Sequence, residues 1–522
     1  MKKYIMAIDD GTTGIRALIF DEDANLVSRA YRAVDQIFPR PGWCEQDAME
    51  VWKKCVEVMK KALSSADIDA KSIEAVGITT QRSTNLMWDE DGKPVYNAIT
   101  WHDTRTAEMC NKMNRDRKMM AMRGIGKIFK GLSHMAPSMR RRVATARLIT
   151  AADISFTPVP SLPKVRWVLD NVEGARKKAE KGQLMFGTMD TWLLWNLTGG
   201  KQHATDFSNV SATSMYDTFK LKWSSIFLDI FDIPEEILPD VRETAGDYGL
   251  MDKNILGEEI PITSMVADQQ SSLFAQGCFN EGEIKCTHGT GSFIDMNVGD
   301  KPAASVHRLL PMIAWRINKK THYLLEGMIN TTGAAVEWLK ENFGVIDSVE
   351  ESEKIAFSTE AEGVYFVPAF TGLSSPYWDA HASGVVIGLC RRTRREHIVR
   401  AVLEGIVYRC RDVVEAMQTD AGIEIKSIKA DGGASRNNFL LQFMADMLNV
   451  KVERPKMLDA TGLGAAFLAG IARDYWKEDE LLEKRKVDKV FEPKMEEEKR
   501  EKLYNGWKKA VERALKWHSP SC

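Results

Sequence analysis

Short apolar runs alternate with amphipathic stretches along most of the 522-residue chain. An apolar run at residues 4–8 meets the polar segment 9–14, and a second run at 15–20 follows with Arg16 as its only charge. Two apolar runs joined by a tip of Gly and Thr residues are typical of a β-hairpin. We therefore expect a hairpin over residues 4–20.

Nearly the same arrangement returns in the second half of the chain. The stretches 284–287 (Ile-Lys-Cys-Thr) and 293–296 (Phe-Ile-Asp-Met) flank the tip His-Gly-Thr-Gly-Ser. Self-similarity of this kind predicts a duplicated fold with one copy in each half, although chance repetition of so short a motif is the alternative.

Between the two tips, strand-like and helix-like patterns follow one another. We expect strands at 73–79, 84–88 and 95–101, the last two separated by the turn 90–93. A helix is expected to begin at Asp47, which with Glu50 forms a capping-box pattern. Its apolar positions, at 3,4,3,4 spacing, are Met49, Trp52, Val56, Met59 and Leu63.

Four later stretches repeat the helical period. They are residues 332–342, 394–417, 437–447 and 462–473. Helices interleaved with short apolar strands predict an α/β class with mostly buried sheets.

Two segments differ from the rest in composition. Residues 112–147 hold eleven Lys and Arg, one acid (Asp116) and six Met, which favours a solvated basic insertion; binding of an anionic partner and an oligomer contact through the methionines are the alternatives. The segment from 477 onward, with Trp507 and Trp517, favours a terminal helix packed on the outside.

Composition and charge narrow the function. Lys plus Arg (71) nearly balance Asp plus Glu (73) for a net charge of −2, so no basic field is available to hold nucleic acid. The eight cysteines are dispersed, which favours reduced thiols. The apolar run at 4–8 is too short for a signal peptide, and no apolar run reaches the roughly 18 residues of a membrane span. We expect a cytoplasmic protein with no membrane partner.

Several frequent chemical motifs are missing. No Gly-x4-Gly-Lys-Ser/Thr motif occurs, since the Gly-Lys pair at 126–127 is followed by Ile128, so there is no P-loop. His-Glu-x-x-His is also missing, and the nine histidines show no metal-ligand spacing. A metal ion, if one is used, is expected on oxygen ligands.

The glycine-bearing tips offer a different route to phosphate binding. At the first tip Gly11 permits close approach, Thr12 and Thr13 offer hydroxyl and backbone N–H donors, and Asp9 offers a carboxylate for Mg²⁺. A plain hairpin turn is the alternative for one such tip. The segment 431–437, Asp-Gly-Gly-Ala-Ser-Arg-Asn, follows an apolar run and precedes a helix, so three turns suit one nucleotide.

Taken together, ordered motifs along nearly the whole chain resemble the FGGY family of carbohydrate kinases, and within it the glycerol kinases. The matching runs are 7–14 (AIDDGTTG), 38–43 (FPRPGW), 77–82 (GITTQR), 186–192 (FGTMDTW), 267–270 (ADQQ), 288–291 (HGTG), 366–379 (FVPAFTGLSSPYWD) and 431–433 (DGG).

The resemblance implies a fold and an activity. The fold is α/β, with two actin-like (ribonuclease H-like) ATPase domains, residues 1–265 and 266–522, flanking a nucleotide and substrate cleft. The activity is ATP-dependent phosphorylation of a primary hydroxyl of a small polyol or sugar, with Mg²⁺ as cofactor and glycerol as the leading acceptor. A homo-dimer or tetramer is the family expectation.

The resemblance also implies roles for individual residues. Asp268 matches the catalytic base and Asp9 the carboxylate near Mg²⁺. The nucleotide positions are Thr12, Thr13, Arg16, Thr290, Gly333, Gly433 and Asn437. The acceptor positions are Arg82, Ser83, Trp101, Asp268, Gln269 and Phe293.

Two acceptor positions depart from the glycerol kinase pattern. Ser83 stands where those enzymes carry Glu, and Val159 aligns with a pocket Tyr. Both changes remove a polar partner for glycerol, so a larger polyol or ketose such as erythritol, a pentitol, xylulose or ribulose is the first alternative acceptor. A non-kinase actin-like ATPase is the remote alternative, against which the acceptor residues argue.

Overall fold

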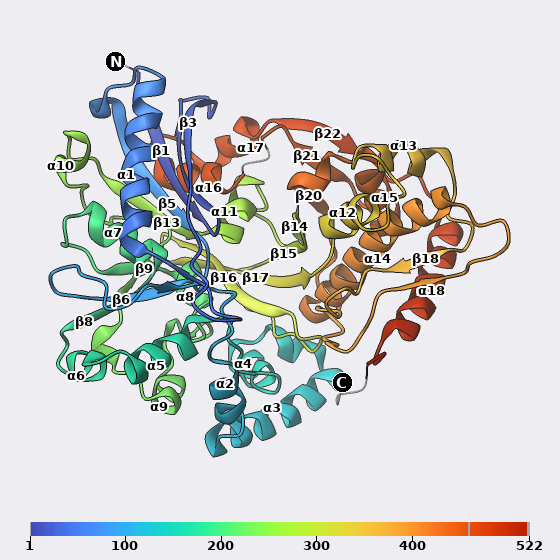
Figure 1. Cartoon of the computed structure of the whole chain (residues 1–522), viewed down its shortest axis with the longest axis horizontal. Helices are drawn as coiled ribbons and strands as arrows, with labels where there is room; N and C mark the ends of the chain where they lie inside the picture. Colours follow the sequence, from blue (N-terminus) through green and yellow to red (C-terminus); the bar gives the residue numbers. More distant parts are fainter. Residues whose placement is uncertain (1, 458–459, 519–522) are drawn as a thin grey trace.

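The computed structural model describes residues 2–457 and 460–518. Figure 1 shows an N-terminal half, in blue and green, beside a C-terminal half, in yellow to red, each built on its own sheet. Within the described residues, no helix combines the length and the apolar character needed to cross a membrane.

The N-terminal sheet contains the expected hairpin. Its strand order is β13-β5-β1-β2-β3. The strands β1, β2 and β3 are antiparallel, whereas β5 and β13 run parallel to β1 and β5 respectively. Their bounds are Tyr4–Gly11 (β1), Gly14–Phe20 (β2), Leu26–Ala33 (β3), Ile73–Thr80 (β5) and Ile262–Ala267 (β13).

The C-terminal sheet repeats this arrangement. Its order is β16-β17-β15-β14-β20-β21-β22, with β14, β15 and β17 antiparallel and with β20 and β21 added in parallel. The bounds are Glu283–His288 (β14), Ser292–Gly299 (β15), Leu310–Ile317 (β16), Lys320–Ile329 (β17), Ser427–Asp431 (β20), Val452–Pro455 (β21) and Val487–Phe491 (β22). The predicted duplication is therefore confirmed, since three antiparallel strands are followed by two parallel ones in each half.

A smaller sheet lies beside the N-terminal one, in the order β4-β7-β6-β8. Its strands are Glu45–Gln46 (β4), Asn85–Asp89 (β6), Ala98–Ile99 (β7) and Leu184–Thr188 (β8). The strand expected at 95–101 is shortened to β7. Trp101 has left it, because its indole turns to the first hairpin tip, where Nε1 donates to Thr12 Oγ1 at 2.9 Å.

Helix α1 (Ala48–Ser65) begins where the capping pattern predicts, and the Asp47 carboxylate accepts from the N–H groups of Met49 and Glu50. The reciprocal half of the box is missing, because Glu50 pairs with Lys54. The predicted apolar face is shifted: Met49 is exposed. The helix packs on β2 and β3 through a neighbouring face made of Val51, Cys55, Val58, Met59 and Ala62.

Helix α16 (Ala460–Ile471) comes from the C-terminal half but packs on the N-terminal sheet beside α11 (Asp268–Ala275), as Figure 1 shows. Ser264 Oγ donates to Ala465 O at 2.8 Å. A Cβ atom on Gly77 would lie 2.3 Å from that same carbonyl oxygen, so glycine is required for this close approach. The expected boundary at residue 265 falls inside β13, the last strand of the N-terminal sheet.

The basic segment forms α3 (Arg117–Met135), a short 3-10 helix η2 (Pro137–Arg141) and α4 (Val143–Ala151). The expectation of a solvated insertion is wrong for η2, which touches the C-terminal half. Arg140 is buried and donates to Thr419 O at 2.9 Å, and Arg141 donates to Val298 O at 2.8 Å. The insertion therefore bridges the two halves.

The end of the chain is only partly the external helix that was expected. Strand β22 extends the C-terminal sheet before α18 (Glu497–Ala514) begins. Trp507 is a residue of α18 and is buried, whereas Trp517, which follows the helix, is exposed.

Candidate active site

The first hairpin tip places a carboxylate and two threonines together. Asp9, buried at the end of β1, pairs through Oδ2 with Arg16 Nη1 of β2 at 3.0 Å. Thr12 and Thr13 form the turn between the strands, and Trp101 reaches Thr12 from the smaller sheet. The structure thus joins three predicted nucleotide residues to one predicted acceptor residue.

The second tip, between β14 and β15, lies against the start of helix α12 (Gly333–Glu341). Gly333 N donates to Gly289 O at 3.0 Å, and Thr332 N donates to Thr290 O at 2.9 Å. These bonds hold Thr290 at the N-terminus of α12, where the positive end of the helix dipole favours an anion.

The third glycine turn reaches the same tip from β20. Gly432 has φ +85° and a Cβ there would lie 2.4 Å from His288 O, so this turn requires glycine. Gly433 follows, exposed, at the start of η4 (Gly433–Arg436). Asn437 caps α15 (Asn438–Leu448) by accepting from Leu440 N at 3.0 Å. The predicted nucleotide residues of the C-terminal half are therefore neighbours.

Three of the residues predicted to contact the acceptor meet here, because Asp268 and Phe293 lie around the guanidinium group of Arg82. Its Nε lies 3.4 Å from Asp268 Oδ1 and its Nη1 lies 2.7 Å from Glu326 Oε2. Its Cζ stands 5.8 Å from the centroid of the Phe293 ring. Because Arg82 and Glu326 come from different halves, this charge cluster spans the two sheets.

Asp268 is the first residue of α11, directly after β13. Its Oδ1 accepts from Gln269 N at 2.7 Å. Burial raises the pKa of this carboxyl, while the Arg82 guanidinium and the Gln269 N–H act in the opposite direction. A carboxylate with a raised pKa, still partly exposed at 28% of its side chain, suits a general base.

Three buried charged residues, Lys285, Asp295 and Glu326, were not predicted from the sequence. The strand register places Lys285 opposite Asp295, and Asp295 opposite Glu326, in one row across β14, β15 and β17. Lys285 Nζ donates to Asp295 Oδ2 at 2.8 Å and to Gln269 Oε1 at 2.6 Å. A signal existed in the sequence, since each of these charges interrupts an apolar run, where an unpaired charge is costly.

Glu326 is the most perturbed acid of the row. Burial raises its pKa to about 7, although Arg82 acts to lower it. Glu326 therefore changes charge near neutral pH. When Glu326 is protonated, Arg82 loses the negative charge of one of its two carboxylate partners.

The structure places the two departures from the glycerol kinase pattern in different surroundings. Ser83 Oγ donates to Ala212 O at 2.9 Å, so this hydroxyl is directed at the backbone. Val159 is 48% exposed and presents no polar side chain. Its carbonyl accepts from the buried Lys164 Nζ at 2.7 Å.

Two copies of one α/β unit, with glycine turns for phosphate and a carboxylate–guanidinium cluster beside them, define a two-domain kinase of the ATPase-like class. Family models for the FGGY carbohydrate kinases match the chain: the N-terminal domain over residues 4–135 and 132–275, and the C-terminal domain over 284–473. The chain belongs to the FGGY family of carbohydrate kinases and is an ATP-dependent kinase. The break in the N-terminal match falls inside the basic insertion.

Individual relatives agree along the whole length. The chain is 48% identical to a glycerol kinase of Caldanaerobacter subterraneus subsp. tengcongensis, with 99% of each chain covered. It is also 48% identical to glycerol kinase 2 of Thermotoga maritima, again over 99% of both. The crystal structure of Plasmodium falciparum glycerol kinase with ADP superposes with a TM-score of 0.88 at 33% identity, covering 98% of each chain.

Proposed function

We propose that this kinase transfers the γ-phosphoryl group of ATP to a primary hydroxyl of a small polyol, with glycerol as the leading acceptor. The observation that carries the proposal is the Asp268–Arg82 pair at 3.4 Å, beside Phe293 and the two phosphate-type tips. The glycerol kinases at 48% identity support the choice of acceptor.

In the proposed mechanism Asp268 accepts the proton of the attacking hydroxyl. Arg82 orients the acceptor and favours the ionised form of Asp268. Trp101 and Phe293 offer flat apolar faces to the carbon chain of the polyol, and Gln269, held by Lys285, offers its amide group.

ATP is proposed to lie across both halves. Thr12, Thr13 and Arg16 donate from the first tip, and Thr290 from the second. The backbone N–H of Gly433 adds an uncharged donor. Gly333, whose own N–H bonds to Gly289 O, is proposed to line the site, and Asn437 marks the far end of the nucleotide site. Donors placed in advance around the γ-phosphate stabilise the charge that develops during transfer.

The carboxylate and hydroxyl oxygens at the first tip are suited to binding Mg²⁺. Asp9 offers a carboxylate, and the register places Thr79 opposite it. The hydroxyl oxygen of Thr79 is buried with no hydrogen-bond partner among the described residues. These are the hard ligands that Mg²⁺ prefers. Bound there with ATP, Mg²⁺ would neutralise phosphate charge.

Ser83 and Val159 favour a second candidate acceptor. Neither side chain supplies the polar group that the resembled enzymes direct at glycerol. Two lost hydrogen bonds, at roughly 0.5–1.5 kcal/mol each, would weaken glycerol turnover by about 10-fold or more. A polyol or ketose slightly larger than glycerol is therefore the alternative.

An ADP-release screen separates the candidates. It compares glycerol, dihydroxyacetone, erythritol, pentitols, xylulose and ribulose for the wild type and for Ser83→Glu. If glycerol is the substrate, it gives the highest kcat/KM in the wild type. If a larger acceptor exceeds glycerol, and Ser83→Glu reverses the order, the second candidate replaces the first. No acceptor-dependent ADP release would overturn both.

We also propose that the two halves, 1–265 and 266–522, act as separate domains joined by α11 and α16.

We propose in addition that the chain assembles as a homo-dimer or tetramer. Analytical ultracentrifugation of the full chain tests the assembly, and a monomer at micromolar concentration would contradict it.

A further inference from the structure

A cluster of soft donor atoms lies directly behind the second phosphate tip. Cys286 and His288 are on β14, and Cys410 is on α14 (Arg395–Ala421), all three buried. One donor atom from each lies within 4.8 Å of the others. This cluster was not predicted from the sequence, because His288 and Cys410 are 122 positions apart in the chain.

The imidazole is held in an orientation suited to metal binding. His288 Nδ1 bonds to Ser292 Oγ at 2.9 Å, and Ser292 Oγ bonds to Thr332 Oγ1 at 2.7 Å. Nε2 is the ring nitrogen nearer to Cys286 Sγ, at 3.4 Å against 4.0 Å for Nδ1. A hydroxyl that fixes one ring nitrogen while the other faces ligands is the outer-shell arrangement of protein metal sites.

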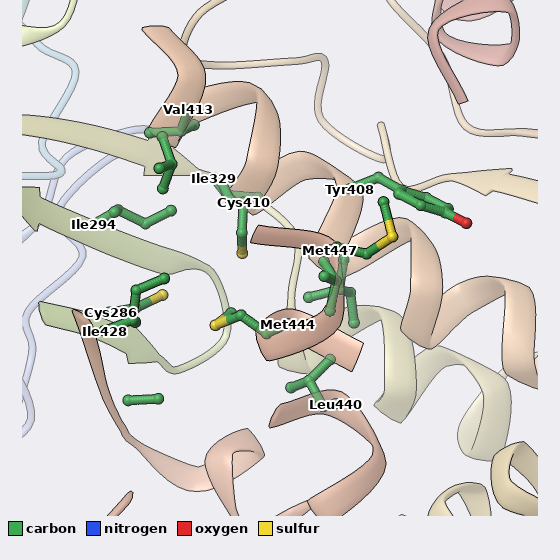
Figure 2. Close-up of a cluster of buried hydrophobic side chains, with 14 of the residues drawn as sticks. Cys286, Ile294, Ile329, Tyr408, Cys410, Val413, Ile428, Leu440, Met444 and Met447 are labelled. Atoms are coloured by element: carbon green, nitrogen blue, oxygen red, sulfur yellow. The ribbon is translucent and has the colours of Figure 1, made fainter. Parts of the chain in front are cut away.

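Figure 2 shows the surroundings of the two thiols. The sulfur atoms of Cys286 and Cys410 point into one space, and the thioether of Met444 from α15 points into the same space. The walls are apolar, with Ile294, Ile329 and Ile428 among them. Such walls offer no oxygen ligands, and thiolate, imidazole and thioether select thiophilic ions over Mg²⁺.

The spacing is close to what such an ion needs. A tetrahedral ion about 2.3 Å from sulfur and about 2.0 Å from nitrogen holds its ligand atoms roughly 3.6–3.8 Å apart. The Cys286–His288 separation is already near this value. Cys410 has to approach by no more than about 1 Å, given the 4.8 Å limit on all three atoms.

We propose that Cys286, His288 and Cys410 bind one thiophilic d¹⁰ cation, Zn²⁺ or Cu⁺, with Met444 able to complete the shell. Binding converts both thiols to thiolates and releases two protons to solvent. The backbone oxygen of His288 lies against Gly432, so a shift of His288 toward Cys410 would displace the nucleotide turn. We expect the bound ion to weaken ATP binding by roughly 5- to 150-fold. This proposal depends on ATP use and not on the acceptor.

The test uses the full chain with Cys390→Ser and Cys522→Ser, because Cys390 is exposed and would bind such ions alone, and Cys522 lies outside the described residues. Co²⁺ is the spectroscopic probe. We expect thiolate-to-cobalt charge-transfer absorption that saturates at one equivalent and is displaced by Zn²⁺ and, under anaerobic conditions, by Cu⁺. The stronger of these two competitors identifies the favoured ion.

Two variants locate the site. Cys410→Ala should abolish the cobalt absorption, whereas the matched control Cys278→Ala, another buried thiol, should retain it. Absorption that is absent from the parent, or that persists in Cys410→Ala, would overturn the proposal.

A second measurement needs no core substitution. Zn²⁺ should protect Cys286 and Cys410, but not Cys278, from slow alkylation in the native protein, as read by peptide mass spectrometry. Equal alkylation of all three thiols with and without Zn²⁺ would overturn the site. ATP affinity that stays unchanged in the Zn²⁺-loaded protein would overturn its link to the nucleotide turn. Neither result depends on which polyol is phosphorylated.

Discussion

The two hairpins at the centre of the molecule share a topology but differ in how deeply they bury charge. In the N-terminal hairpin Asp9 pairs with Arg16 near the tip, and the arginine side chain is 39% exposed. In the C-terminal hairpin Lys285 pairs with Asp295 further from the tip, and both side chains are fully buried. The two hairpins therefore hold the same kind of cross-strand ion pair at different degrees of burial.

The difference in burial indicates which of the two ion pairs is available for chemistry. The half-exposed Arg16 guanidinium can turn to phosphate at modest cost if a cation, such as the proposed Mg²⁺, then faces the buried Asp9 carboxylate. A fully buried pair cannot separate without leaving an uncompensated charge. We infer that the Asp9–Arg16 pair works on ATP and magnesium, whereas the Lys285–Asp295 pair holds Gln269 and the base of the acceptor site in place.

The largest expected effect is on stability, at the buried pair. Asp295→Asn leaves Lys285 charged and unpaired, and should lower the free energy of unfolding by about 3–5 kcal/mol. Asp9→Asn is the matched substitution in the other hairpin and should cost less than about 1 kcal/mol. Urea unfolding of both variants measures the difference, and equal losses would contradict the contrast between the hairpins.

The next effect is on turnover, at the Asp9–Arg16 pair. Asp9→Asn should lower kcat by roughly 10- to 100-fold, as expected for loss of a charged partner worth about 1.5–3 kcal/mol, and should raise the magnesium concentration needed for half-maximal rate. Steady-state assays over a magnesium series test this. The exposed Asp300→Asn serves as control and should match the wild type.

A pH profile tests the cluster between the halves. Burial raises the pKa of Glu326 to about 7, so protonation below that pH removes the charge that holds Arg82. The wild-type kcat/KM should fall as the pH drops through about 7. Glu326→Gln should be about 10-fold less active at pH 8 and should lose this acid limb. An unchanged limb in Glu326→Gln would assign it to another group.

The smallest effect concerns the bridge formed by the basic insertion. Arg141 donates to Val298 O at 2.8 Å and to Glu281 at 2.9 Å across the two halves. Arg141→Ala should cost about 1 kcal/mol of stability. Arg142→Ala, at a neighbouring exposed position, should cost less. If thermal unfolding ranks the two variants in the opposite order, the bridge does not stabilise the fold.

Local patterns predicted much of the fold. Alternating apolar runs and glycine tips located both hairpins, and Asp47 located the start of α1. The buried face of that helix could not be read correctly, because packing against β2 and β3 selects Val51 and Cys55 over Met49. The bridge by Arg140 and Arg141 was also hidden, since its partners lie more than 130 residues away in the chain.

The residues of the site likewise include some that were predicted from the sequence and some that were not. Residues in contiguous motifs, such as Asp268 beside Gln269 and Thr290 in its tip, were found from the sequence. Their roles remain proposals. Glu326 was missed because its importance depends on Arg82, which reaches it only when the two halves meet. The Cys286–Cys410 contact was missed for the same reason, as it joins a strand to a distant helix.

The central claim is that Asp268 activates a polyol hydroxyl for attack on ATP. The most direct test is ADP release with and without acceptor, in the wild type and in Asp268→Asn, with ATP affinity measured separately. We expect wild-type ADP release to require the acceptor and to fall about 10²–10⁴-fold in Asp268→Asn while ATP binding persists. Near-wild-type turnover in Asp268→Asn, or ADP release that is independent of any acceptor, would contradict the account.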